Sequence, residues 1–285
     1  MSISEEVRVK IGLVTMDRAR MYRRLAGIAV VTALALIWLP TLANELELEQ
    51  RLFFAVHGIC AQSHNLIVGG VQFPLCARDS GIYLGLMTAL GVIAGRGRWR
   101  AGRLPPLPIG LTLVGFVVIM GIDGLNSTVA ELGFQALYPP RNDLRLLTGL
   151  GFGVAMAVGL LLVANHTLLA PDLIDTEQAP IAGWYDLGLV LGAVGMVALA
   201  IATDQEILAW PLVLISVIGV TGVMSFAIAL PISAIAGLNG RIRRPQQLLL
   251  PGSAGFLVAL LLLALLARWK IELEVQGLLP PPLVP

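Results

Sequence analysis

Residues 145–164 read RLLTGLGFGVAMAVGLLLVA, and the only charged side chain in this stretch is the arginine at its start. A helix that crosses a membrane needs about 20 mostly apolar residues, so the stretch predicts a transmembrane helix. Six other stretches have the same character, at roughly 25–43, 80–95, 107–123, 181–202, 208–236 and 248–267. We therefore expect an all-α fold, a polytopic transmembrane helix bundle of about seven spans.

The composition of the whole chain supports this expectation. Of its 285 residues, 57% are hydrophobic and 13% are charged, whereas about a quarter of the residues in a soluble domain are charged. The mean hydropathy is +0.85. We expect the lipid bilayer to cover this apolar surface. The net charge of +1 provides no field that would recruit nucleic acid, so no nucleic-acid partner is expected.

Positive charge is distributed unevenly between alternate loops, which indicates orientation. With seven spans, 13 of the 19 basic residues fall on the side of the N-terminus, in segments 8–24, 96–103 and 241–244. Because cytoplasmic loops carry the excess of arginine and lysine, we expect the N-terminus inside. A count of six or eight spans stays open, because segment 208–236 is long and contains Pro211 and Pro231.

The expected span ends divide the chain into four parts. They are a cytoplasmic basic leader (1–24), a membrane core of four spans (25–164), three further spans (165–267) and a proline-rich C-terminal tail (268–285). The run 25–43 ends at Thr41-Leu42-Ala43, which is weakly similar to a signal-peptide cleavage site. The run is longer than the usual signal core, so we expect an uncleaved span.

Polar residues gather where three predicted spans begin or end on the expected outer face. They are Arg78, Asp79, Asp123, Asn126, Asn142, Arg145 and Thr148. Ionisable groups at membrane depth are costly and usually paired. We therefore expect Asp79, Asp123 and Arg145 to meet in one outward-facing cluster that binds a ligand. The alternative is that each is an interfacial residue facing water.

A second group of chemically active residues lies in the window 57–79, HGICAQSHNLIVGGVQFPLCARD. It holds both cysteines and two of the three histidines. The spacing of His57, Cys60 and His64 places them on one face of a helix, and the apolar stretches around them predict a short interfacial or re-entrant helix. A glycine-containing turn and Cys76 follow.

Three interpretations of this window stay open. Two histidines and two cysteines, with Asp79 as a further ligand, suit a tetrahedral zinc site, whose ligands would be His57, Cys60, His64, Cys76 and Asp79. A disulfide between the two cysteines is the second interpretation, and closing such a loop stabilises a protein by about 3 kcal/mol. Buried apolar thiols beside interfacial histidines are the third.

Glycines recur within the span 145–164, at Gly149, Gly151 and Gly153. Their spacing imitates a nucleotide-binding glycine run, but they lie inside an apolar segment. Small residues at this spacing allow membrane helices to approach closely. We therefore expect these glycines to pack against another helix.

Four short elements carry a resemblance to a known family. They are Cys60-Ala61-Gln62, the run Cys76–Gly85 (CARDSGIYLG), Asp123-Gly124, and Asn142, Arg145, Thr148 and Gly149. Over roughly residues 52–153 the chain resembles the bacterial and archaeal membrane proteins grouped as the domain of unknown function 2085. The resemblance implies the plasma membrane of a prokaryote as its location, and it carries no established activity.

Two positions depart from the family pattern. Ala61 stands where the family has a histidine, and Asp79 stands where it has a cysteine. If the family site is a Cys/His metal centre, this chain has lost two ligands. Either His57 or His64 together with Asp79 replaces them, or the site is degenerate and structural.

Three functions remain open at this point, and whether the protein is an enzyme is undecided. The first is an integral membrane protein with an outward-facing site that binds a metal or works on a thiol, lipid or quinone. The second is a transporter or channel for an ion or small solute, which the Asp/Arg cluster and the proline-containing span would suit. The third is an accessory subunit whose apolar tail, GLLPPPLVP, packs against other membrane proteins.

Overall fold

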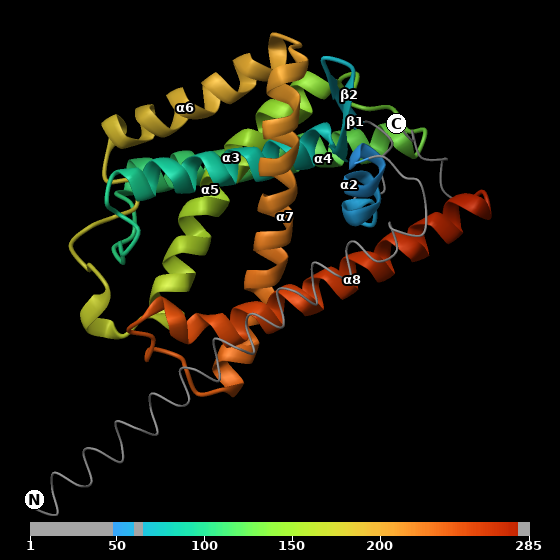
Figure 1. Ribbon diagram of the computed structural model, residues 1–285. Helices are drawn as coiled ribbons and strands as arrows, with labels where there is room; N and C mark the ends of the chain where they lie inside the picture. The colour runs from blue at the N-terminus through green and yellow to red at the C-terminus, as the bar shows by residue number, and fades with distance from the viewer. Residues whose placement is uncertain (1–47, 60–64, 279–285) are drawn as a thin grey trace, which may run out of the picture.

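The structure, a computed structural model, describes residues 48–59 and 65–278 and is mostly helical (Figure 1). Its elements, in chain order, are α2 (Leu48–Val56), β1 (Asn65–Val68), β2 (Val71–Cys76), α3 (Ala77–Gly95), α4 (Leu107–Glu131), α5 (Asn142–Leu168), a 3-10 turn (Pro171–Leu173), α6 (Trp184–Ala202), α7 (Glu206–Ile235), a second 3-10 turn (Pro245–Leu248) and α8 (Leu249–Val275).

Five helical segments of the described chain are long and apolar enough to cross a membrane. They are α4, α5, α6, α7 and the segment Pro245–Val275 that contains α8. α3 is not among them, because Arg78 and Asp79 in its first turn lower its mean hydropathy. The predicted span 25–43 lies outside the described residues. A count of seven spans and an inside N-terminus therefore stay predictions.

α3 and α5 cross in direct backbone contact at the centre of the bundle. Gly81 and Gly85 of α3 face Gly149 and Gly153 of α5, and a Cβ atom at any of the four would overlap a backbone carbonyl oxygen of the opposite helix. This is the packing expected for Gly149 and Gly153. Gly151 turns toward α4, where a Cβ would lie 3.3 Å from the Phe116 ring.

A β-hairpin replaces the interfacial or re-entrant helix predicted for the apolar run before Cys76. β1 and β2 pair antiparallel, and the turn between them consists of Gly69 (φ +56°) and Gly70 (φ +81°). Two successive positive φ angles end any helix and form the tight turn that suits a hairpin. Val68 and Phe73 are buried in the main core beside α3.

The ends of the bundle differ in character. At one end, here called the hairpin end, lie the β-hairpin, the start of α3, the end of α4 and the start of α5. The α6–α7 turn belongs to it too, since Asp204 accepts a hydrogen bond of 2.6 Å from the Gly69 amide.

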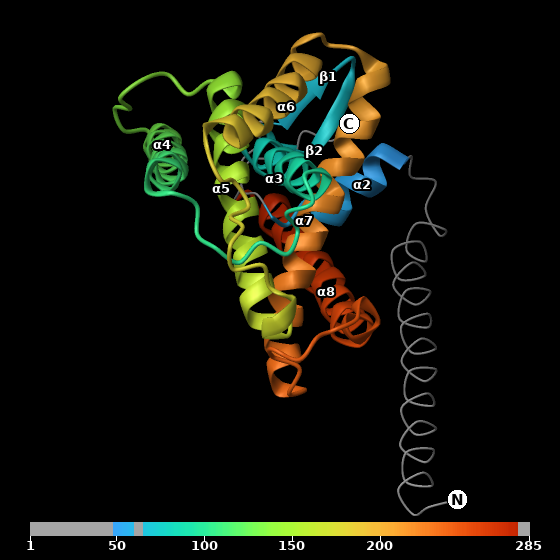
Figure 2. The same cartoon turned by 90° about the vertical axis from the view of Figure 1, so that its left-hand side faces the viewer.

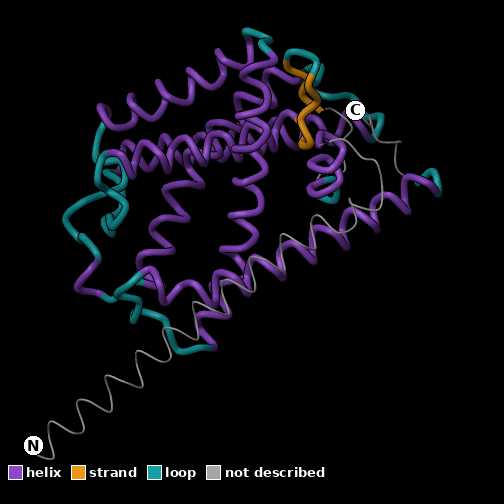
Figure 3. The backbone as a smooth tube through the Cα atoms, viewed as in Figure 1, coloured by secondary structure: helices purple, strands orange, loops and turns teal. Residues whose placement is uncertain are grey.

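At the other end, here called the loop end, the long connections meet. Ala101 pairs with Asp175 and Leu169 with Ile242, and Figure 3 shows these connections in teal, away from the hairpin. α4 stands at the side of the bundle next to α5 (Figure 2).

Candidate functional site

A buried polar cluster lies at the hairpin end, where α3, α4 and α5 meet. Arg78 Nη2 donates to Asp123 Oδ2 and to Ser127 Oγ, each at 2.8 Å. The Asp123 side chain is only 1% exposed, and that of Arg78 11%. Among the described residues nothing accepts a hydrogen bond from the buried Arg78 Nε. The arginine therefore enters the cluster with spare donor capacity.

Arg145, from the first turn of α5, is the second arginine of the cluster and is buried, at 2% exposure. Its three contacts are long: 3.3 Å to Ser127 Oγ, 3.4 Å to Asn142 Oδ1 and 3.5 Å to Glu131 Oε1. Charge-assisted hydrogen bonds are usually about 2.7–2.9 Å. The Arg145 charge is therefore held without a close ionic partner among these contacts.

Asn126 and Tyr138 shape the edge of the cluster. The Asn126 amide accepts from Leu137 N at 2.7 Å and donates to Tyr138 O at 2.9 Å, so it pins the α4–α5 loop. The Tyr138 hydroxyl then donates to Asp123 Oδ1 at 2.9 Å. Burial and this hydrogen bond raise the pKa of Tyr138 above its ordinary value of 10.0, so the phenol stays protonated as a donor.

The structure brings together the six residues that the sequence marked as a ligand site, but Asp79 does not take its expected place beside Asp123. They are Arg78, Asp123, Asn126, Asn142, Arg145 and Thr148. Arg78, rather than Asp79, is the α3 residue in contact with Asp123, because neighbouring helix positions point about 100° apart. Asp79 instead accepts from Cys76 Sγ at 3.3 Å.

Three members of the cluster were missed from sequence. Ser127 lies four residues after Asp123, so helical spacing on α4 could have indicated it. Glu131 lies one turn further on. Tyr138 belongs to an irregular loop, and no sequence signal points to it.

His57 lies directly after the end of α2, in a turn and not in a helix. α2 ends at Val56, and Gly58 in the following turn lies against the α8 backbone, which leaves no room for a Cβ atom there. The helix predicted for this window is therefore wrong at residues 57–59, and the face that His57 would share with Cys60 and His64 stays a prediction. Cys60 and His64 lie outside the described residues.

The His57 ring pairs with the far end of the chain. Its Nε2 lies 3.0 Å from Glu274 Oε2, with both side chains 4% exposed. Lys270 Nζ donates to His57 O at 3.2 Å and lies 3.5 Å from Glu274. Desolvation lowers the pKa of His57 below 6.5, although the Glu274 hydrogen bond acts in the opposite direction.

The zinc and disulfide interpretations gain no support from the described chain. Residues 48–59 and 65–278 contain no group of three or more His, Cys, Asp or Glu side chains placed to hold a metal ion. Cys76 Sγ caps α3 by accepting from the Asp79 amide at 3.5 Å. With His57 paired to Glu274, the expected ligand set loses one member.

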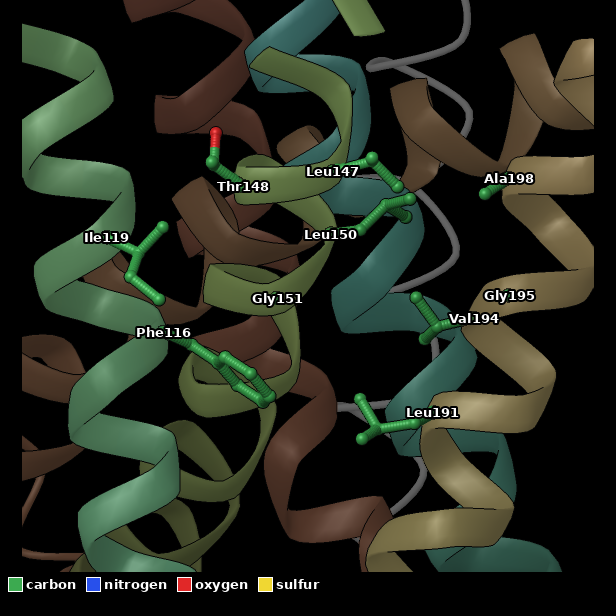
Figure 4. Close-up of a pocket in the computed structure, with 10 residues that line it drawn as sticks. All are labelled: Phe116, Ile119, Leu147, Thr148, Leu150, Gly151, Leu191, Val194, Gly195 and Ala198. Atoms are coloured by element: carbon green, nitrogen blue, oxygen red, sulfur yellow. The ribbon is translucent and has the colours of Figure 1, made fainter. Parts of the chain in front are cut away.

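Two hollows adjoin the polar cluster. The mouth pocket, about 560 Å³, lies at the hairpin end. Four of its six lining residues are polar or charged: it is lined by Ala130, Glu131, Pro140, Arg141, Asn142 and Arg145. The interhelical cavity, about 350 Å³, lies between α4, α5 and α6. Of the ten residues that line it in Figure 4, only Thr148 is polar.

Fold and site together define a helical membrane protein with a buried arginine–carboxylate cluster at one end. Residues 60–159 match the model of a family described as predicted membrane protein (DUF2085), in agreement with the resemblance above. The matched segment supplies every residue of the polar cluster. No curated protein and no solved structure matches the chain.

Proposed function

We propose that this multi-pass membrane protein binds an anionic ligand at the outward-facing cluster of Arg78, Asp123 and Arg145. The observation that carries the proposal is the buried Arg145 guanidinium: its three side-chain contacts are 3.3–3.5 Å long, while the one buried carboxylate of the cluster, Asp123, pairs with Arg78. Burying an ion costs several kcal/mol unless a close partner compensates it. Glu131, whose side chain is 39% exposed and 3.5 Å from Arg145, offsets little of this cost.

The charge distribution supports an outward orientation for this cluster. Seven arginines belong to the opposite, loop end: Arg96, Arg98, Arg100, Arg103, Arg241, Arg243 and Arg244. Cytoplasmic loops carry such an excess of arginine. If the loop end is cytoplasmic, the hairpin end and its cluster face the outside.

The chemistry of the mouth pocket favours a phosphate or carboxylate group. Arg145, Arg141 and Asn142 line it with guanidinium and amide donors. A guanidinium presents its N–H groups in a planar fork that matches the oxygens of phosphate and carboxylate. Arg141 is engaged by Asp143, so Arg145 is the residue that we expect to bind the anion.

Ligand-dependent stability tests this proposal. Purified protein in detergent is heated with increasing inorganic phosphate against sodium chloride of matched ionic strength. Phosphate should raise the unfolding temperature of the wild type, because a ligand at about 100 times its Kd stabilises the folded state by about 2.7 kcal/mol.

Two arginine variants complete the test. Arg145→Gln should abolish the response, whereas Arg243→Gln, at the loop end and paired with exposed Asp172, should retain it. If Arg145→Gln does not fold, Arg145→Lys replaces it, with a weakened response expected. The proposal would be contradicted if phosphate did not raise the unfolding temperature of the wild type, or if it raised that of the Arg145→Gln variant by the same amount.

A metal or disulfide site stays a second candidate, because two of the residues that it needs, Cys60 and His64, lie outside the described chain. Cys76 and Asp79 lie side by side at the start of α3, with Sγ 3.3 Å from Oδ2. Cys60 and His64 would complete the ligand set for zinc, or Cys60 would pair with Cys76. Metal analysis of the purified protein, with thiol titration before and after reduction, tests both possibilities. A protein with no bound metal and two reactive thiols would contradict both.

A further inference from the structure

We infer that the anionic ligand is a lipid, whose phosphate head group binds at Arg145 and whose hydrocarbon chain occupies the interhelical cavity between α4, α5 and α6. This inference rests on the proposed function, since it takes the anion site as its starting point. It adds the chemical class of the molecule that carries the anion. Three observations support it.

The first observation is that the polar cluster and the apolar cavity share a boundary at Thr148. Arg145 and Thr148 are three residues apart on α5, a rise of about 4.5 Å along the helix. Thr148 Oγ1 lies 3.5 Å from Asp123 Oδ2, while the same residue lines the cavity. Charged donors and an apolar volume therefore adjoin within one helical turn.

The second observation is the chemistry of the cavity wall. Figure 4 shows Phe116 and Ile119 reaching from α4 toward α5, with Leu191 and Val194 on α6 opposite. Its volume of about 350 Å³ is within the range of small-molecule sites. A wall of hydrocarbon suits a hydrocarbon chain, because it offers almost no hydrogen-bond partner to a polar ligand.

The third observation is lateral access. Ile119 and Leu147, which flank the cavity, are each 54% exposed, although both lie within helices apolar enough to span a membrane. Their exposed surfaces would face the bilayer. A lipid chain can therefore enter sideways, whereas a water-soluble anion has no reason to occupy this volume.

Chain-length dependence separates a lipid from a free phosphate. The purified protein is titrated with four probes: inorganic phosphate, dihexanoyl phosphatidic acid, dioleoyl phosphatidic acid and dioleoylglycerol. Binding is measured by the shift in unfolding temperature and by native mass spectrometry. Dioleoyl phosphatidic acid should bind at least tenfold more tightly than the dihexanoyl form, and dioleoylglycerol should bind at least tenfold more weakly than dioleoyl phosphatidic acid.

A pair of glycines on α6 provides a variant and its matched control. Gly195 lines the cavity, Gly188 does not, and both have open space where a Cβ would lie. Gly195→Leu should weaken binding of dioleoyl phosphatidic acid at least tenfold and leave the response to inorganic phosphate unchanged. Gly188→Leu should leave both unchanged. If Gly195→Leu does not fold, Ala198→Leu, which lines the same cavity, replaces it.

The outcomes distinguish failure of this inference from failure of the proposed function. Phosphate binding without any dependence on chain length, or unaltered lipid binding in Gly195→Leu, overturns the lipid inference and leaves the anion site standing. Equal binding of dioleoylglycerol and dioleoyl phosphatidic acid overturns the role of the head group. No response to any phosphate-containing probe overturns both.

Discussion

Asp123 is the residue on which the polar cluster depends. Its two carboxylate oxygens accept from Arg78 at 2.8 Å and from the Tyr138 hydroxyl at 2.9 Å, with Thr148 at 3.5 Å. It thereby joins α3, α4, α5 and the α4–α5 loop. Because the carboxylate is buried, its negative charge and the positive charge of Arg78 compensate each other's cost of removal from water.

Removing the charge of Asp123 should therefore destabilise the protein strongly. Breaking a buried ion pair by changing one partner costs about 3–5 kcal/mol, because the other charge stays buried without compensation. We expect Asp123→Asn to lose stability of that order in thermal or denaturant unfolding of the purified protein. Asp172→Asn is the matched control: its salt bridge with Arg243 is exposed, so little change is expected. Equal effects of the two variants would contradict this role for Asp123.

His57 gives the hairpin end a dependence on pH. Burial lowers the pKa of the folded-state imidazole below 6.5, while the unfolded chain has the ordinary value. Below pH 6.5 the unfolded state therefore binds more protons, and stability falls as the pH drops toward the folded-state pKa. We expect the unfolding temperature to decrease from pH 7 to pH 5.

His57→Gln should make this decrease smaller, because glutamine does not titrate. The measurement is the unfolding temperature of both proteins at a series of pH values and constant ionic strength. Relative to the variant, the wild type should lose stability as the pH falls below 6.5, and the difference between the two curves should be constant above pH 6.5. Parallel curves would show that His57 contributes nothing to the pH dependence.

At the scale of elements, the α3–α5 crossing and the β-hairpin position the cluster. Backbone contact at Gly81, Gly85, Gly149 and Gly153 holds the start of α3 against the start of α5, and so places Arg78 within reach of the α4–α5 end. The hairpin covers the core beside α3 with Val68 and Phe73. The α3–α5 crossing leaves no room for added volume at these glycines.

Gly85→Val should consequently disrupt the bundle. A valine Cβ would overlap the Leu150 carbonyl, and inserting volume into packed cores costs about 1–3 kcal/mol or more. We expect a loss of at least about 3 kcal/mol, or failure to yield a monodisperse protein by size exclusion. Gly188→Val on α6, where nothing lies within 4 Å, is the matched control. Comparable behaviour of the two variants would argue against close α3–α5 packing.

At the scale of the whole molecule, the arrangement of charge at the two ends bears on orientation. Carboxylates balance part of the arginine excess of the loop end: Asp186 pairs with Arg96 and Arg98. The predicted functions of transporter and of accessory subunit stay predictions.

Cysteine labelling tests the orientation directly. In a background without Cys60 and Cys76, Gln205→Cys reports on the exposed α6–α7 turn, and Gln246→Cys reports on an exposed position of the loop end. With an inside N-terminus, a membrane-impermeant maleimide should label position 205 in intact cells and position 246 only after lysis. The reverse pattern would contradict both the orientation and an outward-facing cluster.

Much of the helical architecture was predictable from the sequence, because hydropathy runs and span ends are local properties. The helices α4 to α8 were expected close to where they lie, and so were the six polar residues of the site, since residues at adjoining span ends must lie near one another. The Gly69-Gly70 pair is a hairpin signal, but it lies inside an apolar run, which was interpreted as a helix. α8 also continues to Val275, past the start expected for the tail.

Local sequence determined which segments are apolar helices and where charge must gather at their ends. Only the tertiary structure decided the partners of those charges. His57 and Glu274 are 217 residues apart, and Arg78 replaces Asp79 because a helix rotates by about 100° per residue. Hydropathy determines which segments lie in the membrane. The rotation of each helix about its axis, and the contacts between distant segments, depend instead on how the side chains of all the elements pack together.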